Sequence, residues 1–330
     1  MELPSAGQHP DAFHFCAGSE RLKFSAWAIG WLRYLARVRW NKVSIIGVGL
    51  LGGSLGQALI ARGLARQVVG CVRRKATLTQ AKRARAVHTA TLDFAAGVAE
   101  ADLIVLCTPI AQMRHTLQQL LPHLKEGAIV TDVGSVKSSV VHELEILAAE
   151  AGAHFVGSHP MAGSDKMGVK AARPSLYEGA VCVVTPTKRT NRRAARAVEQ
   201  VWKSVGARTI RLSPEAHDQL VARSSHLPHL LAALLVNHTL GKGIARQPLL
   251  CATGFRDTTR IASGSPEMWR DIAIANRANL ARTLGEFTRE LRALQKLIQQ
   301  GNEQALTKFF EQAKALRDGW CNKAGYASPE

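Results

Sequence analysis

From residue 42 onward, apolar and polar positions follow two regular patterns in turn. Short apolar runs of strand length are followed by longer stretches in which apolar residues recur at helical spacing. The predicted strands are residues 42–49, 67–72, 101–109, 127–135, 154–160, 180–187 and 207–213. The predicted helices among them are residues 50–64, 76–86, 112–124, 136–152 and 191–205. This alternation predicts an α/β domain over residues 42–212, built on a doubly wound (Rossmann) parallel sheet.

The pattern changes after residue 213, where strands disappear. Residues 214–241 follow one long helical pattern that is interrupted near Pro228, and residues 265–301 and 302–320 follow two more. They predict an all-helical second domain over residues 213–330, with a role in substrate binding and dimerisation. Long apolar helices often complete their core against a second subunit, so we expect a homodimer.

Residues 1–41 belong to neither pattern and are predicted to be a poorly ordered extension. The apolar run at 24–32 is bounded by Lys23 and Arg33. It is too short to cross a membrane, which takes about 20 apolar residues. A signal peptide and a surface amphipathic helix are the alternatives for this segment. We expect no membrane partner.

A glycine-rich turn joins the first predicted strand to the first predicted helix. Its GxGxxG pattern consists of Gly47, Gly49 and Gly52, with Leu50 and Leu51 between the last two. In this position the pattern predicts a dinucleotide site. The first glycine permits the tight turn, the second lets the backbone approach a pyrophosphate, and the third lets the helix pack on the strand. The helix N-terminus then faces the phosphate charge.

The end of the second predicted strand bears on the choice of cofactor. An NAD site usually has an acidic residue there, which binds the ribose 2′-hydroxyl. This chain has Val72, Arg73 and Arg74 instead, and no acid lies between Arg66 and Asp93. Guanidinium groups match the geometry of a phosphate. The sequence therefore favours NADP over NAD, with a solvated basic helix start as the alternative.

Candidate chemical groups follow two neighbouring predicted strands. Ser135 comes just after one strand, and His159 ends the next. Both are therefore expected at one edge of the sheet, where open α/β sheets bind ligands. A histidine with its ordinary pKa of about 6.5 is suited to accept an alcohol proton. The alternatives are a structural histidine and a serine that caps the following helix.

The helical region contains two further polar segments. Ser225, His226 and His229 lie within one helical turn, where they either line a pocket or form the polar side of a packed helix. Residues 254–269 are predicted to be a loop rich in Gly, Thr and Arg between two helices.

Arginines in and beside this predicted loop favour an anion site. They are Arg256, Arg260 and Arg270, and the alternative is that some of them pair with Asp257 or Glu267. Guanidinium groups of this kind can anchor the carboxylates of a ligand.

Composition narrows the class of partner. The 43 Lys and Arg residues outnumber the 25 Asp and Glu, which gives a formal net charge of +18. Such an excess indicates anionic partners: nucleic acid, a membrane surface or acidic small molecules. The six cysteines are scattered without a CxxC pair. They predict neither a metal site nor a disulfide framework, which fits a reducing cytoplasm.

These segments together resemble the prephenate/arogenate dehydrogenase family of tyrosine biosynthesis. The resemblance covers about residues 42–275 and is carried mainly by GSHPMAGSDKMGV, SSHLPHL and GFRDTTRIASGSPEMWRDI, with IIGVGLLGGSLGQAL, ADLIVLCTPI and TDVGSVK in family order. It implies NAD(P)-dependent oxidative decarboxylation of prephenate, arogenate or both. It also implies the single-function form, without an appended regulatory or chorismate mutase domain.

The resemblance implies roles for individual residues. His159 matches the catalytic histidine that polarises the ring hydroxyl for hydride loss, and Ser135 matches the serine that shares this hydroxyl. Arg260 matches the arginine that holds the ring carboxylate. The other matches are Ser225, His226, His229, Asp165, Asp257 and Trp269 in the substrate pocket, and Thr108 and Pro109 at the cofactor.

Two other classes of function remain open from the sequence. A β-hydroxyacid or imine-reductase-like NADP dehydrogenase also joins such a sheet to helices, but it would need a lysine or aspartate where this chain has the histidines of SSHLPH. An NADP-sensing or nucleic-acid-binding protein would use the basic surface. We expect no nucleic-acid partner, because no basic stretch interleaved with aromatic residues occurs.

Overall fold

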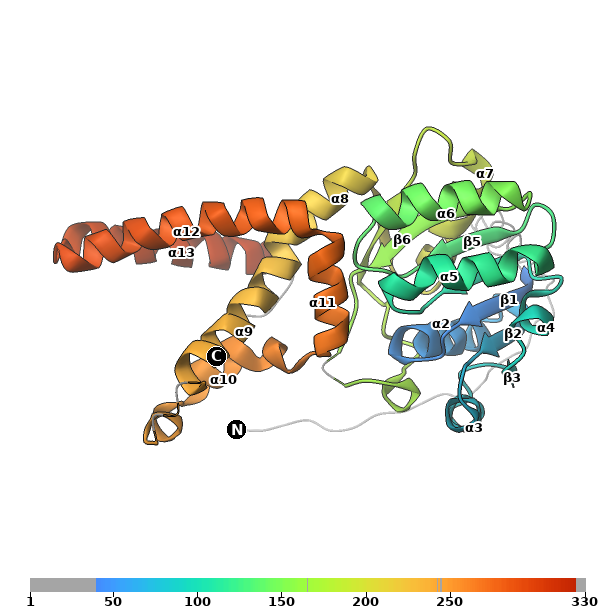
Figure 1. The fold of residues 1–330 in the computed structure, drawn as a ribbon, viewed down its shortest axis with the longest axis horizontal. Helices are drawn as coiled ribbons and strands as arrows, with labels where there is room; N and C mark the ends of the chain where they lie inside the picture. The colour runs from blue at the N-terminus through green and yellow to red at the C-terminus, as the bar shows by residue number, and fades with distance from the viewer. Residues whose placement is uncertain (1–39, 165, 242, 244, 325–330) are drawn as a thin grey trace, which may run out of the picture. The chain divides into compact units, whose positions relative to one another are not determined.

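The structure, a computed structural model, describes residues 40–324 except residues 165, 242 and 244. An eight-stranded sheet with the order β3-β2-β1-β4-β5-β6-β7-β8 forms its centre (Figure 1). The strands are β1 Trp40–Ile46, β2 Ala65–Cys71, β3 Thr89–Thr91, β4 Leu103–Leu106, β5 Ile129–Asp132, β6 His154–Pro160, β7 Val181–Thr185 and β8 Arg208–Arg211. The apolar run at 24–32 lies outside the described residues.

The sheet is mostly parallel, as predicted. The strands from β3 to β6 pair in parallel, and the order reverses at β1, which lies between β2 and β4. Open sheets of this kind bind ligands at such a reversal. β7 runs antiparallel to β6, contrary to the wholly parallel prediction. Parallel strands need a helical crossover, and the described part of the connection from β6 to β7 contains only the 3-10 turn η2 (Val169–Ala171).

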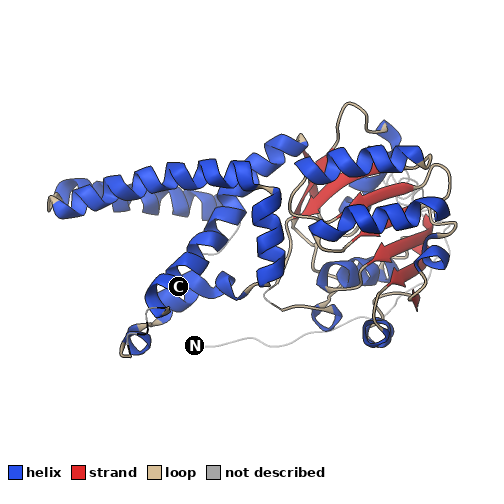
Figure 2. Ribbon diagram, viewed as in Figure 1, coloured by secondary structure: helices blue, strands red, loops and turns tan. Residues whose placement is uncertain are grey.

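Helices cover both faces of the sheet (Figure 2). They are α2 Leu50–Ala61, α3 Lys75–Arg83, α4 Phe94–Val98, α5 Ile110–Leu120, the 3-10 turn η1 Leu121–His123, α6 Ser138–Glu150 and α7 Arg192–Ser204. α2, α3 and α7 share one apolar core, to which Leu55, Leu59 and Trp202 contribute. α4, α5 and α6 share the other, around Leu117 and Leu144. Full burial of such side chains contributes about 1.5–3 kcal/mol each, and it keeps the strand ends in register.

After β8 the described chain is helical. The elements are α8 Pro214–Val221, the π-turn η3 Ala222–His226, α9 Leu227–Leu240, η4 Gln247–Leu250, α10 Thr253–Thr259, η5 Arg260–Ser263, α11 Pro266–Ala275, α12 Arg277–Gln299 and α13 Glu303–Ala324. α12 and α13 lie side by side (Figure 1). Among the described helices, none combines the length and the apolar character needed to cross a membrane.

The predicted interruption near Pro228 is confirmed: the π-turn separates α8 from α9, and Pro228 occupies the first turn of α9, where its missing N–H is tolerated. Two other helical predictions were wrong in detail. Residues 265–301 divide at Asn276, which separates α11 from α12. Residues 254–269 are not a loop, since most of them lie in α10, η5 and the start of α11. The short elements β3 and α4 were not predicted.

Candidate active site

The glycine-rich turn between β1 and α2 has the geometry that its sequence predicts. Gly47 has φ +98°, and a Cβ there would lie 2.8 Å from the carbonyl oxygen of Cys107. A Cβ on Gly52 would lie 2.2 Å from the carbonyl oxygen of Gly47, so only glycine lets α2 approach the turn. At Gly49, no described atom lies within 4 Å of the corresponding position. The turn therefore leaves open space beside Gly49, just before the N-terminus of α2.

The strand β4, next to β1, is followed by an unpaired hydroxyl group at the carboxyl edge of the sheet. Thr108 and Pro109 follow β4, and the N–H of Cys107 donates to the carbonyl oxygen of Ile46 at 2.8 Å, which joins the ends of β4 and β1. Within the described residues, the buried Oγ1 of Thr108 has no hydrogen-bond partner. An orphaned hydroxyl beside an open glycine turn fits a nicotinamide dinucleotide, which binds across such a strand reversal.

Arg73 and Arg74 follow β2 at this edge, and both are exposed. Arg74 precedes the first residue of α3, and its side chain makes no capping hydrogen bond. Val72, at the position where NAD sites carry an acid, is buried, and its N–H donates to the carbonyl oxygen of Thr91 at 3.0 Å. The two guanidinium groups are therefore available to a ligand on the β2 side of the turn.

His159 lies near the end of β6 and is 8% exposed. Its Nδ1 is 2.8 Å from Nε2 of His217 in α8, and Nδ1 of His217 is 2.8 Å from Oδ1 of Asp218. The carboxylate of Asp218 accepts two backbone hydrogen bonds, from the N–H of Lys137 at 2.7 Å and the N–H of Ser138 at 2.8 Å. A chain of three side chains thus links β6 to α8 and to the start of α6.

The surroundings keep His159 neutral. Burial lowers the pKa of His159 well below its ordinary value, and the neighbouring His217, Lys137 and His226 lower it further. The pKa of Asp218 is lowered, because hydrogen bonds from His217 and from backbone N–H groups outweigh the effect of burial. A neutral imidazole at the carboxyl edge of the sheet can act as a proton acceptor.

A buried ion pair fixes the strand ends beside His159. The side chains of Lys137 and Asp132 are fully buried and in direct contact. Nζ of Lys137 also donates to the carbonyl oxygen of Ser158 at 3.0 Å, and the N–H of Ser158 donates to Asp132 at 3.1 Å. Because both charges are paired and hydrogen-bonded, they hold β5, β6 and the start of α6 in one geometry.

Ser135 lies in the loop between β5 and α6 and is partly buried. It does not cap α6, since that helix begins at Ser138 without a side-chain cap. The backbone of Ser135 lies against the imidazole of His226 instead. The capping alternative is therefore wrong, and Ser135 lies beside the segment that contains Ser225, His226 and His229.

His226 lies in the π-turn and is 1% exposed. The side-chain amide of Asn276 donates to the carbonyl oxygen of Asp218 at 2.9 Å and lies 3.1 Å from Nδ1 of His226. Asn279 donates to Oδ1 of Asn276, which orients the amide so that its nitrogen faces His226. Nδ1 of His226 therefore accepts, and Nε2 carries the proton. Nε2 has no hydrogen-bond partner in the described part of the chain, and burial lowers the pKa of His226 to about 4.

His229 and Trp269 form an aromatic pair next to this segment. Their rings stack with centroids 3.6 Å apart, and Nδ1 of His229 donates to the carbonyl oxygen of Ser225 at 3.0 Å. Burial lowers the pKa of His229, and the charge of the nearby Arg260 lowers it further. The structure thus brings together four of the predicted substrate residues: Ser225, His229, Trp269 and Arg260.

Two of the three candidate arginines have carboxylate partners next to them in sequence. Arg256 contacts Asp257 at 3.1 Å, and Arg270 contacts Asp271 at 2.7 Å. Arg260 is exposed and forms no ion pair with another described residue. The pairing alternative therefore holds for Arg256, and Arg260 remains the candidate for a ligand carboxylate.

Asp165, the predicted gate, lies outside the described residues. The sequence pattern did not predict five further residues around this site: His217, Asp218, Lys137, Asp132 and Asn276. Lys137 and Asp132 flank Ser135 in the TDVGSVK segment, so a sequence signal existed for them. His217 and Asp218 occur in an ordinary helical stretch, and only their burial distinguishes them.

Comparisons with known proteins match both parts of the chain. The family model of the prephenate dehydrogenase nucleotide-binding domain matches residues 55–211, and that of the prephenate dehydrogenase dimerization domain matches residues 213–312. Prephenate dehydrogenase of Bacillus subtilis (strain 168) is 34% identical over 284 residues, which cover 84% of this chain and 76% of that protein.

Solved structures agree with these matches. Prephenate dehydrogenase of Aquifex aeolicus, in complex with hydroxyphenyl propionate and NAD+, has a TM-score of 0.80 and 32% identity, and the match covers 84% of this chain and 98% of that one. Arogenate dehydrogenase of Synechocystis has a TM-score of 0.72 and 33% identity, covering 84% and 99%.

Proposed function

Because the chain belongs to the prephenate dehydrogenase family, we propose that it oxidatively decarboxylates prephenate to 4-hydroxyphenylpyruvate, arogenate to tyrosine, or both. The observation that carries this proposal is the neutral, buried imidazole of His159 at the same sheet edge as the open glycine turn. Family membership speaks against the hydroxyacid and imine-reductase alternative. It equally disfavours a protein that only senses NADP or binds nucleic acid.

Cofactor binding is assigned to the turn and the neighbouring strand ends. Gly47, Gly49 and Gly52, with Leu50 and Leu51, would form the pyrophosphate site at the N-terminus of α2. Thr108 and Pro109 would line the nicotinamide side. When bound, the nicotinamide supplies the hydride acceptor. Arg73 and Arg74, beside the apolar Val72, favour NADP over NAD, since they offer donors to a 2′-phosphate and no acceptor to a 2′-hydroxyl.

His159 is the proposed proton acceptor. Its Nε2 takes the proton from the 4-hydroxyl of the substrate as hydride leaves the same carbon. The ring carboxylate then departs as CO2, and its bonding electrons complete the aromatic ring. The resulting phenolate oxygen takes the proton back from His159, so protons and electrons balance. Ser135 is proposed to share the hydroxyl and to keep it in line with the imidazole.

The helical region is proposed to hold the rest of the substrate. Arg260 binds a carboxylate, and the stacked His229 and Trp269, with Ser225 and His226, line the pocket. Asp257 and Asp165 are proposed at its margin, with Asp165 as a gate. Arg260 should orient the ring carboxylate without stabilising it so strongly that it cannot leave.

A homodimer in the cytoplasm is part of the proposal. The dimerization-domain match over residues 213–312 supports the dimer. The five described cysteines, at positions 71, 107, 182, 251 and 321, are free thiols, which suits a reducing compartment. The domain limits of 42–212 and 213–330 are also proposed. They are supported by the two family models, which end at residue 211 and begin at residue 213, and by Ser213, which caps the first helix after the sheet.

The test is the initial rate with prephenate and with arogenate, each paired with NAD and with NADP, followed at the absorbance of the reduced cofactor. We expect turnover with at least one substrate and a lower KM for NADP than for NAD. His159→Asn should lower kcat by about 100-fold or more with a modest change in KM, because an amide cannot take the proton. Equal turnover of wild type and His159→Asn would refute the role of His159. No reduced cofactor with either substrate would refute the proposed function.

A further inference from the structure

The imidazole of His159 has one nitrogen committed to the protein. Its Nδ1 lies 2.8 Å from Nε2 of His217, so that only Nε2 of His159 is left for a substrate. His217 is fully buried, and Asp218 is 1% exposed. This contact crosses from the sheet to α8, and it involves residues to which the proposed function assigns no role.

In the hydrogen-bonded row of His159, His217 and Asp218, the positions of the protons follow from Asp218. The carboxylate of Asp218 has no proton to give, and it already accepts from the backbone N–H groups of Lys137 and Ser138. The contact at 2.8 Å between Asp218 and Nδ1 of His217 therefore requires a proton on that nitrogen. A neutral His217 then has a lone pair on Nε2, which accepts the Nδ1 proton of His159. The lone pair on Nε2 of His159 is thereby left for the substrate.

The charged groups around His159 determine which of them can stabilise its protonated form. Its other titratable neighbours are Lys137, whose ammonium is paired with Asp132, together with His226 and Cys182. None of these stabilises an imidazolium, and burial opposes it further. Asp218 is the carboxylate connected to His159 through hydrogen bonds. It can stabilise the positive charge that forms when His159 takes a proton, as the acid of a triad does for its histidine.

We propose that His217 and Asp218 are positioning residues that place the proton of His159 on Nδ1 and stabilise its protonated form. This inference rests on the proposed function for its effect on rate, whereas the position of the proton is a property of the protein alone. It also means that the proton acceptor on β6 is set in its active form by the first helix after the sheet.

Two substitutions separate this role from simple packing. In Asp218→Asn, an amide nitrogen in the place of Oδ1 gives up the hydrogen bond from the N–H of Lys137 and donates to Nδ1 of His217, while the amide oxygen keeps the hydrogen bond from the N–H of Ser138. His217 then donates to Nδ1 of His159, and Nε2 of His159 carries the proton, which blocks proton acceptance. In His217→Gln, the amide nitrogen can donate to Asp218 while the amide oxygen accepts from His159. This variant therefore preserves the direction of both hydrogen bonds.

The expected kinetic result is a contrast between the two variants. Asp218→Asn should lower kcat by about 100-fold or more with little change in KM, as loss of the correct tautomer does in triads. His217→Gln should stay within about tenfold of wild type, because the tautomer is preserved and only part of the charge stabilisation is lost. Equal losses of kcat in both variants would overturn the proposal, since a packing role predicts no dependence on hydrogen-bond direction.

A second measurement does not depend on the substrate. Long-range proton–nitrogen NMR spectra of protein with 15N-labelled histidine report which ring nitrogen carries the proton. The His159 signals are assigned by their loss in His159→Asn. At about pH 7.5, we expect His159 to be protonated on Nδ1 in wild type and on Nε2 in Asp218→Asn. Protonation on Nε2 in wild type would overturn the proposal even if the enzyme is active. Protonation on Nδ1 in a protein that oxidises neither substrate would support the proposal and refute the function instead.

Discussion

Arg260 differs from the arginines near it in having no carboxylate partner in the part of the chain that the structure describes. Arg256 and Arg270 are each paired with the acid that follows them. An unpaired guanidinium beside the stacked pair of His229 and Trp269 is suited to a ligand carboxylate.

We therefore predict that Arg260→Ala raises the KM of the substrate by about 10- to 100-fold, with a smaller effect on kcat. A charge-assisted hydrogen bond contributes about 1.5–3 kcal/mol, and each 1.4 kcal/mol corresponds to about a factor of ten. Steady-state kinetics measure this. Arg193→Ala, on the exposed side of α7, removes the same charge as a control. A KM that rises equally in both variants would indicate a general electrostatic effect.

Buried histidines give the protein a predictable response to acid. The pKa of His226 is lowered to about 4, and those of His159 and His229 are also lowered, mainly by burial. In the unfolded chain these groups titrate at about pH 6.5. Below that pH the unfolded state therefore binds protons that the folded state does not bind. Stability is therefore fully present above about pH 6.5 and falls toward pH 4.

The expected loss is up to about 1.4 kcal/mol per pH unit for each histidine. Urea unfolding at about pH 7.5, 5.5 and 4.5 measures it. His226→Gln should give a shallower slope of unfolding free energy against pH, whereas replacing the exposed His123 by Gln should leave the slope as it is. An unchanged slope in His226→Gln would contradict a buried, neutral His226.

At the scale of elements, the strand–turn–helix unit of β1 and α2 forms the proposed cofactor site. The last two glycines of its GxGxxG pattern have different roles. Gly52 is needed for packing, since a Cβ there would meet the backbone of the turn, whereas Gly49 faces open space and has a negative φ.

The matched pair Gly52→Ala and Gly49→Ala tests this division. Gly52→Ala should lower the free energy of unfolding by about 1–3 kcal/mol, because α2 must shift away from β1. Gly49→Ala should leave stability nearly unchanged and weaken cofactor binding, since its methyl group occupies the space that the pyrophosphate needs. Urea unfolding and titration calorimetry with NADP separate the two effects. A stable Gly52→Ala protein with normal cofactor affinity would contradict the geometry.

At the scale of the whole molecule, large apolar side chains remain exposed on the long helices of the second domain. They include Leu234 on α9, Leu291 and Ile298 on α12, and Phe310 and Leu316 on α13, with exposed fractions from 55% to 68%. An exposed set of this size indicates a protein interface. Together with the dimerization-domain match, it supports a second copy of the chain as the partner.

We predict that the wild-type protein sediments as a dimer and that the double substitution Phe310→Glu with Leu316→Glu gives a monomer, because two buried charges disfavour association. Cofactor binding, which uses the sheet, should be retained. Leu92→Glu, at an exposed apolar residue before α4, is the control and should stay dimeric. A double variant that remains a dimer in sedimentation velocity would place the interface elsewhere.

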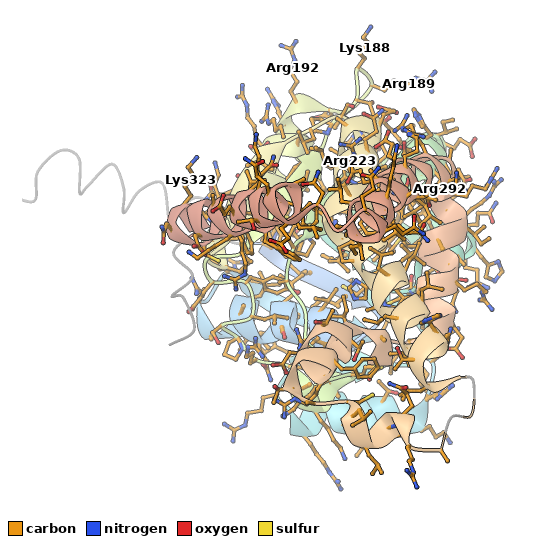
Figure 3. All side chains as sticks on the ribbon, turned by 90° about the vertical axis from the view of Figure 1, so that its left-hand side faces the viewer. Lys188, Arg189, Arg192, Arg223, Arg292 and Lys323 are labelled. Carbon is orange, nitrogen blue, oxygen red and sulfur yellow. The ribbon has the colours of Figure 1, made fainter. Side chains whose placement is uncertain are left out.

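Exposed basic side chains lie on several parts of the molecule. Figure 3 shows Lys188, Arg189 and Arg192 projecting from the segment at the start of α7, Arg292 from α12 and Lys323 from α13. These five exposed side chains come from three segments: the start of α7 with the residues before it, α12 and α13. Positive charge on the surface attracts anionic ligands at long range, which suits the proposed substrate and cofactor.

The sequence alone determined the alternation of strands and helices, the glycine turn and the change to an all-helical second half. These features depend on local periodicity and on residues a few positions apart, which a single chain displays directly. It also indicated the positions of Ser135 and His159, because one follows a strand and the other lies near the end of the next, and the two strand ends meet at one edge. The strand direction of β7 was missed, since nothing local records how a long connection returns.

Only the tertiary structure decided what surrounds His159. The contact with His217 joins residues 58 positions apart, and the backbone donors to Asp218 are even more distant in sequence. His217 and Asp218 are ordinary members of a helical stretch until α8 packs on the start of α6. Packing then excludes water from both side chains, so their hydrogen bonds must be satisfied by whichever groups the fold brings there. For that reason His159 could be named from the sequence as the candidate proton acceptor, while its hydrogen-bond partners could not.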